Sequence, residues 1–166
     1  MSLSTSGLVW DSETSTLFNP AFCAVLLQKA TKSYEAKSGE RMPVTYAFLI
    51  LPCALHMPTR DALPSTTAAS MWTWLRSHPV LLMDFADRVR TFRSFTAAAI
   101  RYGLQHGAVV GALGSLAPGT LLRRPRTLDP TQDWLGCVQA AEFLGRWFGG
   151  TSADEATVLA QWGVRP

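Results

Sequence analysis

The residues whose chemistry could be catalytic are concentrated in the stretch LHMPTRDALPSTTAASMWTWL, residues 55–75, which contains His56, Arg60 and Asp61. Nucleophilic catalysis needs a nucleophile, a base and a group that orients the base. Histidine is the usual base, but none of the chain's three histidines belongs to a nucleophile motif; they are His56, His78 and His106. His78 precedes a proline at a helix junction, where capping or packing is the favoured role. A hydrolase that depends on His56 or His78 is therefore the least favoured function.

Metal and cofactor sites are not supported by the residue spacing either. Cys53 and His56 form an isolated CxxH pair, whereas a tetrahedral zinc site needs four ligands. Cys23 and Cys137 have no close partner in the sequence, so we expect buried free thiols. The chain contains neither a GxxxxGKS or GxxxxGKT phosphate loop nor a GxGxxG motif. The sequence therefore predicts a protein that is not an enzyme and that has no cofactor and no metal.

Basic residues are unevenly distributed, although the formal net charge is only +3. Between Arg76 and Arg126 there are eight arginines and only two acidic residues. Arg123, Arg124 and Arg126 lie beside a predicted hairpin and are candidate contacts to DNA phosphates. A solvated basic loop explains them equally well. The chain's three lysines instead fall towards the C-terminal half of a predicted helix, where the helix dipole favours cations; they are Lys29, Lys32 and Lys37.

The composition indicates a folded protein with apolar surface to spare. Of the 166 residues, 48% are hydrophobic and only 16% are charged, and six are tryptophan. A chain of this length has room for a substantial core, and part of the apolar surplus is expected to face a partner. The alternative is that the tryptophans simply fill the core.

Two uncharged stretches, residues 42–59 and 102–122, are long enough to be considered as membrane spans. Prolines interrupt the first, and glycines with one proline interrupt the second, so neither is expected to form the roughly 20-residue apolar helix that crosses a bilayer. The number of cysteines is odd, their spacing is wide, and the N-terminus lacks the basic region of a signal peptide. We therefore expect a protein of the reducing cytoplasm with no membrane partner.

Helix signals dominate the local pattern. One helix is predicted from Asn19 and Pro20 to Gly39, and another over 44–55 with a kink at Pro52, where a buried strand is the alternative. A third is predicted over 80–103. Two more follow, one that starts at Asp129, Pro130 and Gln132 and one that runs from Ser152 and Glu155 to Gly163. Between Pro58 and Pro64 only a short turn is expected, followed by a helix capped by Ser65 or Thr66. The apolar runs 108–110 and 116–122, separated by glycine-rich turns, predict a β-hairpin.

These elements predict a mainly α fold with a small β-hairpin. We expect an N-terminal tail over residues 1–16 and one compact domain over residues 17–166. Two helices followed by a hairpin with basic residues also occur in winged-helix proteins, so a winged-helix-like arrangement is an option.

Two groups of residues are candidates for contact with a partner. Phe143 and Trp147 form a second apolar stripe on the helix that begins near residue 130, and we assign this stripe to an interface. Arg60 and Asp61 lie on a segment stiffened by Pro58 and Pro64. They either dock a partner or pair with each other and fix the angle between two helices.

Four phrases occur in order along nearly the whole chain, from Leu17 to Pro166: LFNPAFCAVLL, LPCALHMPTRDALP, EFLGRWF and WGVRP. In these phrases the chain resembles the middle component of three-component ABC systems. The resemblance implies a small subunit that acts beside an SMC-like or RecN-like ABC ATPase and a variable effector, often a nuclease, as in Lamassu-type anti-phage defence. Such a subunit would bridge the ATPase and the effector and restrain the effector until foreign DNA is sensed.

The resemblance transfers no catalytic residue to this sequence, and it leaves DNA as a partner only through the complex. The alternative function is a free-standing winged-helix DNA-binding regulator, with phosphate contacts from Arg123, Arg124 and Arg126.

Overall fold

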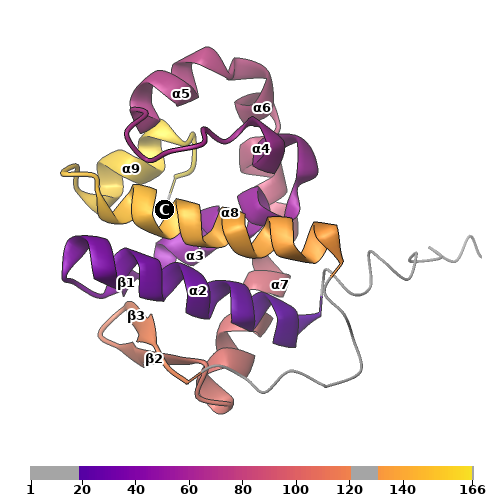
Figure 1. Ribbon diagram of the computed structural model, residues 1–166, viewed down its shortest axis with the longest axis vertical. Helices are drawn as coiled ribbons and strands as arrows, with labels where there is room; N and C mark the ends of the chain where they lie inside the picture. Colours follow the sequence, from indigo (N-terminus) through magenta and orange to yellow (C-terminus); the bar gives the residue numbers. More distant parts are fainter. Residues whose placement is uncertain (1–18, 121–130, 166) are drawn as a thin grey trace, which may run out of the picture.

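The structure, a computed structural model, describes residues 19–120 and 131–165. Eleven helices and strands are assigned within these residues (Figure 1): α2 (Pro20–Ser38), β1 (Met42–Pro43), α3 (Val44–Leu55), α4 (Met57–Ala62), α5 (Met71–Ser77), α6 (Pro79–Met83), α7 (Phe85–Gln105), β2 (Val109–Ala112), β3 (Ser115–Pro118), α8 (Gln132–Gly149) and α9 (Glu155–Gln161). The predicted fold class, mainly helical with a small hairpin in one compact domain, is confirmed. The predicted tail 1–16 lies outside the described residues.

Helix α2 begins and ends where its sequence signals predict. The Asn19 Oδ1 accepts a hydrogen bond from the Ala21 N–H at 2.8 Å, and Pro20 occupies the first helical turn, where its missing N–H costs nothing. At the other end Gly39 has a φ of 75°, and its N–H donates to the Glu35 carbonyl at 2.8 Å. The left-handed conformation needed to end the helix in this way is open to glycine at little cost.

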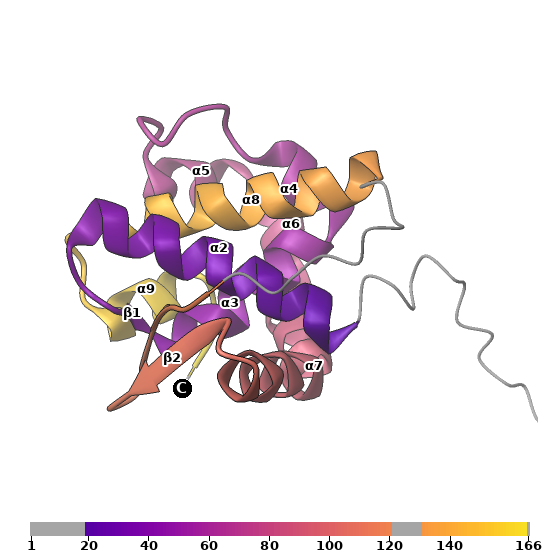
Figure 2. The same ribbon diagram turned by 60° about the horizontal axis from the view of Figure 1, so that its bottom comes forward.

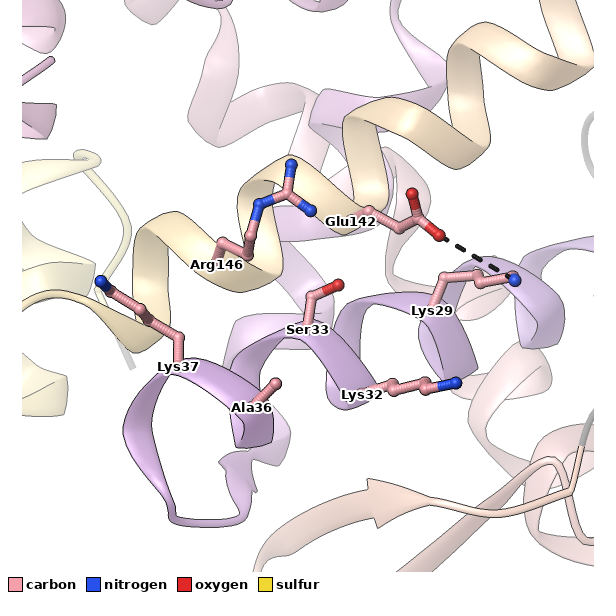
Figure 3. A pocket seen from close by; sticks show the side chains of 7 residues that line it. All are labelled: Lys29, Lys32, Ser33, Ala36, Lys37, Glu142 and Arg146. Atoms are coloured by element: carbon pink, nitrogen blue, oxygen red, sulfur yellow. Dashed lines mark ion pairs between the residues drawn. The ribbon is translucent and has the colours of Figure 1, made fainter. Parts of the chain in front are cut away.

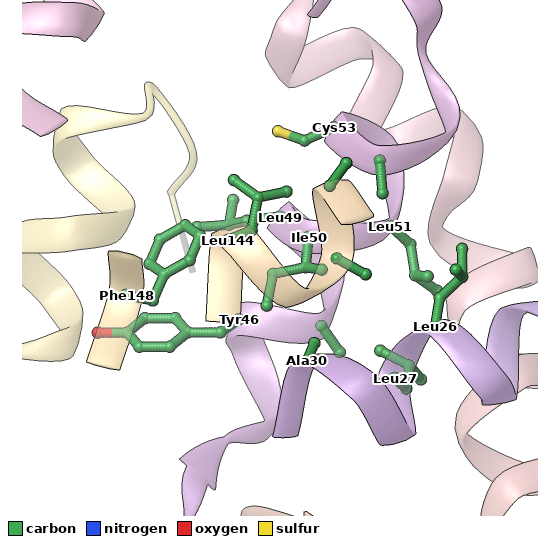
Figure 4. Packing of buried hydrophobic residues seen from close by; sticks show 14 of the residues in the cluster. Leu26, Leu27, Ala30, Tyr46, Leu49, Ile50, Leu51, Cys53, Leu144 and Phe148 are labelled. Atoms are coloured by element: carbon green, nitrogen blue, oxygen red, sulfur yellow. The ribbon is translucent and has the colours of Figure 1, made fainter. Parts of the chain in front are cut away.

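Helix α3 is the central element of the core. Most of its residues are buried, including Tyr46, Leu49, Ile50 and Cys53, and α2, α7 and α8 pack around it. Figure 4 shows α3 side chains meeting Leu26, Leu27 and Ala30 of α2 and Leu144 and Phe148 of α8. A helix that is apolar on all sides is stable only when it is enclosed in this way. The helical interpretation of residues 44–55 is thus confirmed over the buried strand.

Helices α2 and α8 approach each other more closely than ordinary side chains permit. A Cβ atom added at Gly145 would lie 2.3 Å from the carbonyl oxygen of Ala30, and one added at Gly149 would lie 2.8 Å from the carbonyl oxygen of Tyr34. Both distances are too short for real Cβ contacts. The four-residue spacing places both glycines on one face of α8, so that α8 lies along α2 with backbone against backbone.

The sheet contains one more strand than the predicted hairpin. Strands β2 and β3 form the hairpin, and β1 pairs with β3, so the antiparallel order is β1-β3-β2. Leu113 and Gly114, at the tip, both have positive φ (50° and 77°), as the central residues of a type I′ turn require. The Val44 N–H donates to the Gly114 carbonyl at 2.9 Å and fastens the tip to the start of α3. The winged-helix assignment stays a prediction.

An aromatic cluster closes the core between α5, α8 and the C-terminal segment. Its members are Trp74, Phe85, Trp147, Phe148 and Trp162, with neighbouring ring centroids 5.2–6.0 Å apart. His78 stacks on Trp74 at 4.6 Å and lies 2.8 Å from the Trp74 carbonyl, which confirms its predicted packing role. Three of the six tryptophans therefore fill the core.

The expected short turn between Pro58 and Pro64 is wrong, because the segment forms helix α4. Pro58 lies in the first turn of α4. A backbone N–H at this position would have no intrahelical acceptor, so the N–H that proline lacks is not missed. The His56 side chain caps the helix by accepting from the Thr59 N–H at 3.3 Å. The restriction before proline does operate at Leu63, which is extended with a ψ of 142°.

Four other predicted boundaries are corrected. Ser70, rather than Ser65 or Thr66, caps α5, since its hydroxyl accepts from the Thr73 N–H. The predicted helix 80–103 is divided at Asp84 into α6 and α7. Thr131 caps α8 and Asp154 caps α9, each with a side chain that accepts from the third residue along. At the starts of α5, α8 and α9 another side-chain oxygen thus caps the helix in place of the predicted one, whereas the Asp84 side chain makes no capping hydrogen bond.

No helix within residues 19–120 and 131–165 is long and apolar enough to cross a bilayer.

We expect Gly145→Ala to destabilise the protein by about 1–3 kcal/mol, because the added methyl group would push α8 away from α2. This cost opposes the higher helix propensity of alanine, which by itself would stabilise α8 by about 1 kcal/mol. Urea denaturation measures the difference, with exposed Gln139→Ala on the same helix as the matched control. A Gly145→Ala variant at least as stable as the wild type would contradict the close contact.

Candidate functional site

Arg60 connects α4 to α8 beneath the surface. Its side chain is 9% exposed and forms an ion pair with Asp133. The same guanidinium donates to the Ala54 carbonyl and to the Cys137 Sγ, each at 3.0 Å. The predicted pair of Arg60 with Asp61 is wrong, since the carboxylate partner comes from α8, and Asp61 is exposed. Arg60 is therefore placed to hold the α3–α4 corner against α8, and a docking role for Arg60 and Asp61 stays a prediction.

Phe143 and Trp147 face the interior of this chain. They are 7% and 4% exposed, and their ring centroids are 5.1 Å apart. Trp147 also meets Trp74 edge-on at 5.6 Å, and its indole N–H donates to the Ala69 carbonyl at 2.8 Å. These contacts explain the second apolar stripe of α8 by packing within the chain. An interface at these two residues stays a prediction.

The candidate phosphate contacts Arg123, Arg124 and Arg126 lie outside the described residues.

The three cysteines are buried free thiols, as predicted. Burial raises the pKa of Cys23 to about 12 and that of Cys137 to about 11, and it raises the pKa of Cys53 well above its usual range. The nearby guanidinium of Arg88 lowers the pKa of Cys53, but by less than burial raises it. These thiols are thus protonated at neutral pH and poor nucleophiles.

His56 caps α4 rather than meeting Cys53 at a metal site. Its Nδ1 lies 2.7 Å from the Thr59 hydroxyl. Among residues 19–120 and 131–165, no three His, Cys, Asp or Glu side chains converge as metal ligands would.

An open groove of about 410 Å³ runs along the contact between α2 and α8. Figure 3 shows its lining, which we call the lysine groove: Lys29, Lys32, Ser33, Ala36 and Lys37 from α2, and Glu142 and Arg146 from α8. Four cations therefore face one carboxylate. Glu142 pairs with Lys29 at 3.9 Å, and the ion pairs formed within the described residues leave Lys32, Lys37 and Arg146 unpaired.

The groove gathers every lysine in the chain. Of the 15 basic residues only three are lysine, and all three line it. Positions 29, 32 and 37 lie on one side of a helix, and so do Glu142 and Arg146 on α8. The lysine pattern was visible in the sequence, where the helix dipole explained it. What the sequence did not show is that α8 lies beside these lysines with its own polar side facing the same way.

Of the six large apolar side chains that are exposed among the described residues, five lie near the two ends of α7, and the sixth, Met57, lies on α4. At the end near the N-terminus of α7, α6 exposes Val80 (75%) and Met83 (74%), which lie on one side of that short helix. We call this pair the α6 end. At the other end, Leu104 in the last turn of α7, Val110 of β2 and the hairpin-tip residue Leu113 are exposed, and we call these three the hairpin end. Figure 1 shows α6 and the hairpin at opposite ends of the long axis.

Comparison with known proteins identifies a family. The family model described as ABC-three component (ABC-3C) system Middle Component 3 matches residues 9–166, nearly the whole chain. No curated protein and no solved structure matches.

Arg60→Ala should lower the free energy of unfolding by about 1–3 kcal/mol, because it leaves two buried acceptors without their donor and removes the ion-pair partner of the partly exposed Asp133. Asp61→Ala, which removes an exposed carboxylate one residue away, should change it by less than about 0.5 kcal/mol. Denaturant titration of both variants checks the contrast. An Arg60→Ala protein of wild-type stability would instead favour the docking role.

Acidification should weaken the fold through His56. Burial lowers the pKa of His56 below its ordinary 6.5, and the guanidinium groups of Arg88 and Arg60 lower it further. As the pH falls through 6.5, the unfolded chain therefore binds a proton that the folded chain does not, so the free energy of unfolding decreases. A pH series of unfolding curves should show this loss reduced in His56→Asn, which retains a capping side chain. An equal loss in the wild type and in His56→Asn would contradict this account.

Proposed function

The chain belongs to the ABC-three component system Middle Component 3 family, and from that membership we propose that it is a non-catalytic subunit that joins an ABC ATPase to an effector protein in the cytoplasm. We propose an SMC-like or RecN-like ATPase and a nuclease effector, in a bacterial defence complex of the Lamassu kind. A middle component of a multi-component system acts together with partner proteins. We propose here which partners these are and how this chain holds them.

The observation that supports bridging is the separation of the α6 end from the hairpin end. Helix α7 has 21 residues and therefore a length of about 31 Å. Helix α6 directly precedes it and the hairpin directly follows it, so the two exposed apolar groups are held apart by a rigid element. Figure 2 shows α7 leading to the hairpin from a second direction. A subunit that contacts two proteins at once needs two such separate surfaces.

The α6 end is suited to burial by a partner. Helix α6 has no buried residue of its own, although Leu81 and Leu82 pack against the core. Val80 and Met83 therefore place apolar surface in water that a partner could cover with a gain of about 25 cal/mol per Å². Methionine side chains also adapt to the shape of a partner surface.

The hairpin end presents an apolar side chain where a turn would normally have a small polar one. Leu113 is fully exposed at 106% and has a positive φ, which a branched side chain adopts only at a cost. Asparagine or glycine would fit this position of a type I′ turn better. A leucine that is unfavourable for the turn and exposed to solvent is explained if a partner binds it.

We further propose that the subunit restrains the effector through this arrangement. An effector held at one end and an ATPase held at the other would be linked through α7 and the helices packed on it. A change in the ATPase could then alter how the effector is held, and the effector would be released when foreign DNA is sensed.

A DNA-binding regulator is the second candidate, and the exposed face of α7 favours it. Arg90, Arg93 and Arg101 project from this helix directly before the hairpin, although Asp87 pairs with Arg90. For this function, Arg90→Glu with Arg93→Glu should abolish salt-sensitive binding of duplex DNA by the isolated chain. Unchanged DNA binding, or none in the wild type, would reject it.

We expect each end to hold a different partner. Met83→Glu should remove one of the two partner proteins from a purification through the tagged chain, and Leu113→Asn should remove the other. Asparagine suits the positive φ of residue 113, so this variant should fold at least as well as the wild type while losing the apolar contact. Native mass spectrometry of the purified complexes reports which partner is lost.

The control for the added charge is Ser94→Glu, an exposed site on α7 between the two ends, which should retain both partners. Retention of both partners by both end variants would contradict the assignment of these surfaces.

A further inference from the structure

We propose that the lysine groove is the docking site for an acidic helical segment of a protein partner. This inference rests on the proposed function, because it names the chemistry of one contact in the complex. It concerns a surface distinct from the α6 end and the hairpin end.

The first argument is charge. The groove lining has four cations and one carboxylate, and Lys32, Lys37 and Arg146 are unpaired. Like charges gathered in a shallow groove repel one another, and a carboxylate-rich segment would relieve that repulsion and be steered towards it.

The second argument is shape. Lys29 and Lys37 are eight positions apart on α2 and so about 12 Å apart along the helix axis, which is a little more than two helical turns. Between them the groove is lined by the small side chains Ser33 and Ala36. A second hollow of about 300 Å³ shares Lys37 and Arg146 and extends the surface past Ser70. A third helix laid along this contact would find cations on both sides and little bulk beneath it.

The third argument separates a protein segment from nucleic acid. Glu142 projects into the groove and would repel a backbone with a negative charge at every phosphate. A protein helix can place a neutral or basic residue opposite Glu142. The cations also differ from those expected for phosphate, since arginine forms the planar two-point contacts typical of nucleic-acid recognition. The chain's other basic residues are arginine. The ammonium group of lysine is a compact charge on a flexible stem, so the three lysines suit reversible contacts with carboxylates on separate side chains.

The test uses the full chain with Lys32→Glu and Lys37→Glu together. Both side chains are on the surface, so the unfolding midpoint should stay close to that of the wild type. The conservative variant is Lys32→Arg with Lys37→Arg, and the matched charge control is Arg76→Glu with Arg165→Glu, two exposed positions that do not line the groove. The probes are a synthetic glutamate-rich helical peptide and a DNA duplex, each measured by fluorescence anisotropy at low and at physiological salt.

The wild type should bind the acidic peptide more tightly than the DNA, and the groove charge reversal should weaken peptide binding by about tenfold or more. The arginine variant and the Arg76→Glu, Arg165→Glu control should bind the peptide like the wild type. Tighter binding of DNA that the groove variant loses would overturn the inference in favour of nucleic acid. Peptide binding that is absent, or equal in wild type and groove variant, would also overturn it.

Purification of the three-component complex separates this inference from the proposed function. If the wild type brings down both partners and the groove variant loses one of them, both stand. If the groove variant keeps both partners at physiological salt, the groove inference fails and the bridging function stands. If the wild type brings down neither partner, the bridging function fails, and the peptide measurement alone decides whether the groove binds acidic segments.

Discussion

The close contact between α2 and α8 is the constraint on which the rest of the structure depends. Gly145 and Gly149 let the α8 backbone lie against the carbonyl groups of Ala30 and Tyr34, so the two helices pack side by side in close contact. Helix α3 is enclosed because this pair covers it together with α7. The same contact aligns the lysine side of α2 with the polar side of α8 and thereby creates the lysine groove.

The remaining elements are attached to this pair by specific polar and aromatic contacts. Arg60 holds the α3–α4 corner to α8 through Asp133 and two further acceptors. Trp147 holds the segment before α5 through its hydrogen bond to Ala69. Helix α6, by contrast, packs against the core through Leu81 and Leu82, and its other side faces solvent. Side chains whose types suggest catalysis or docking thus turn out to organise the fold.

Local signals made much of the fold predictable, and long-range packing made the rest unpredictable. Asn19, Pro20 and Gly39 define α2 because capping acts within a few residues. The sequence pattern did not predict helix α4 because two effects of proline compete there. Proline disfavours the helical conformation in the residue before it, but it also favours the first turn of a helix, and the residue before Pro58 follows the second effect. The partner of Arg60 lies 73 positions away, and no local pattern reveals it. The lysine groove was missed for the same reason, since lysines on α2 have no meaning as a site until α8 lies beside them. Family membership was accessible because it depends on short phrases along the chain rather than on packing.

The central claim is that this chain joins two other proteins. The most direct test is native mass spectrometry of the complex purified through a tag on the ATPase encoded in the same system, with and without this chain. The account predicts one assembly that contains the ATPase, this chain and the effector, and loss of the effector alone when this chain is deleted. An ATPase that still brings down the effector in the absence of this chain would contradict it.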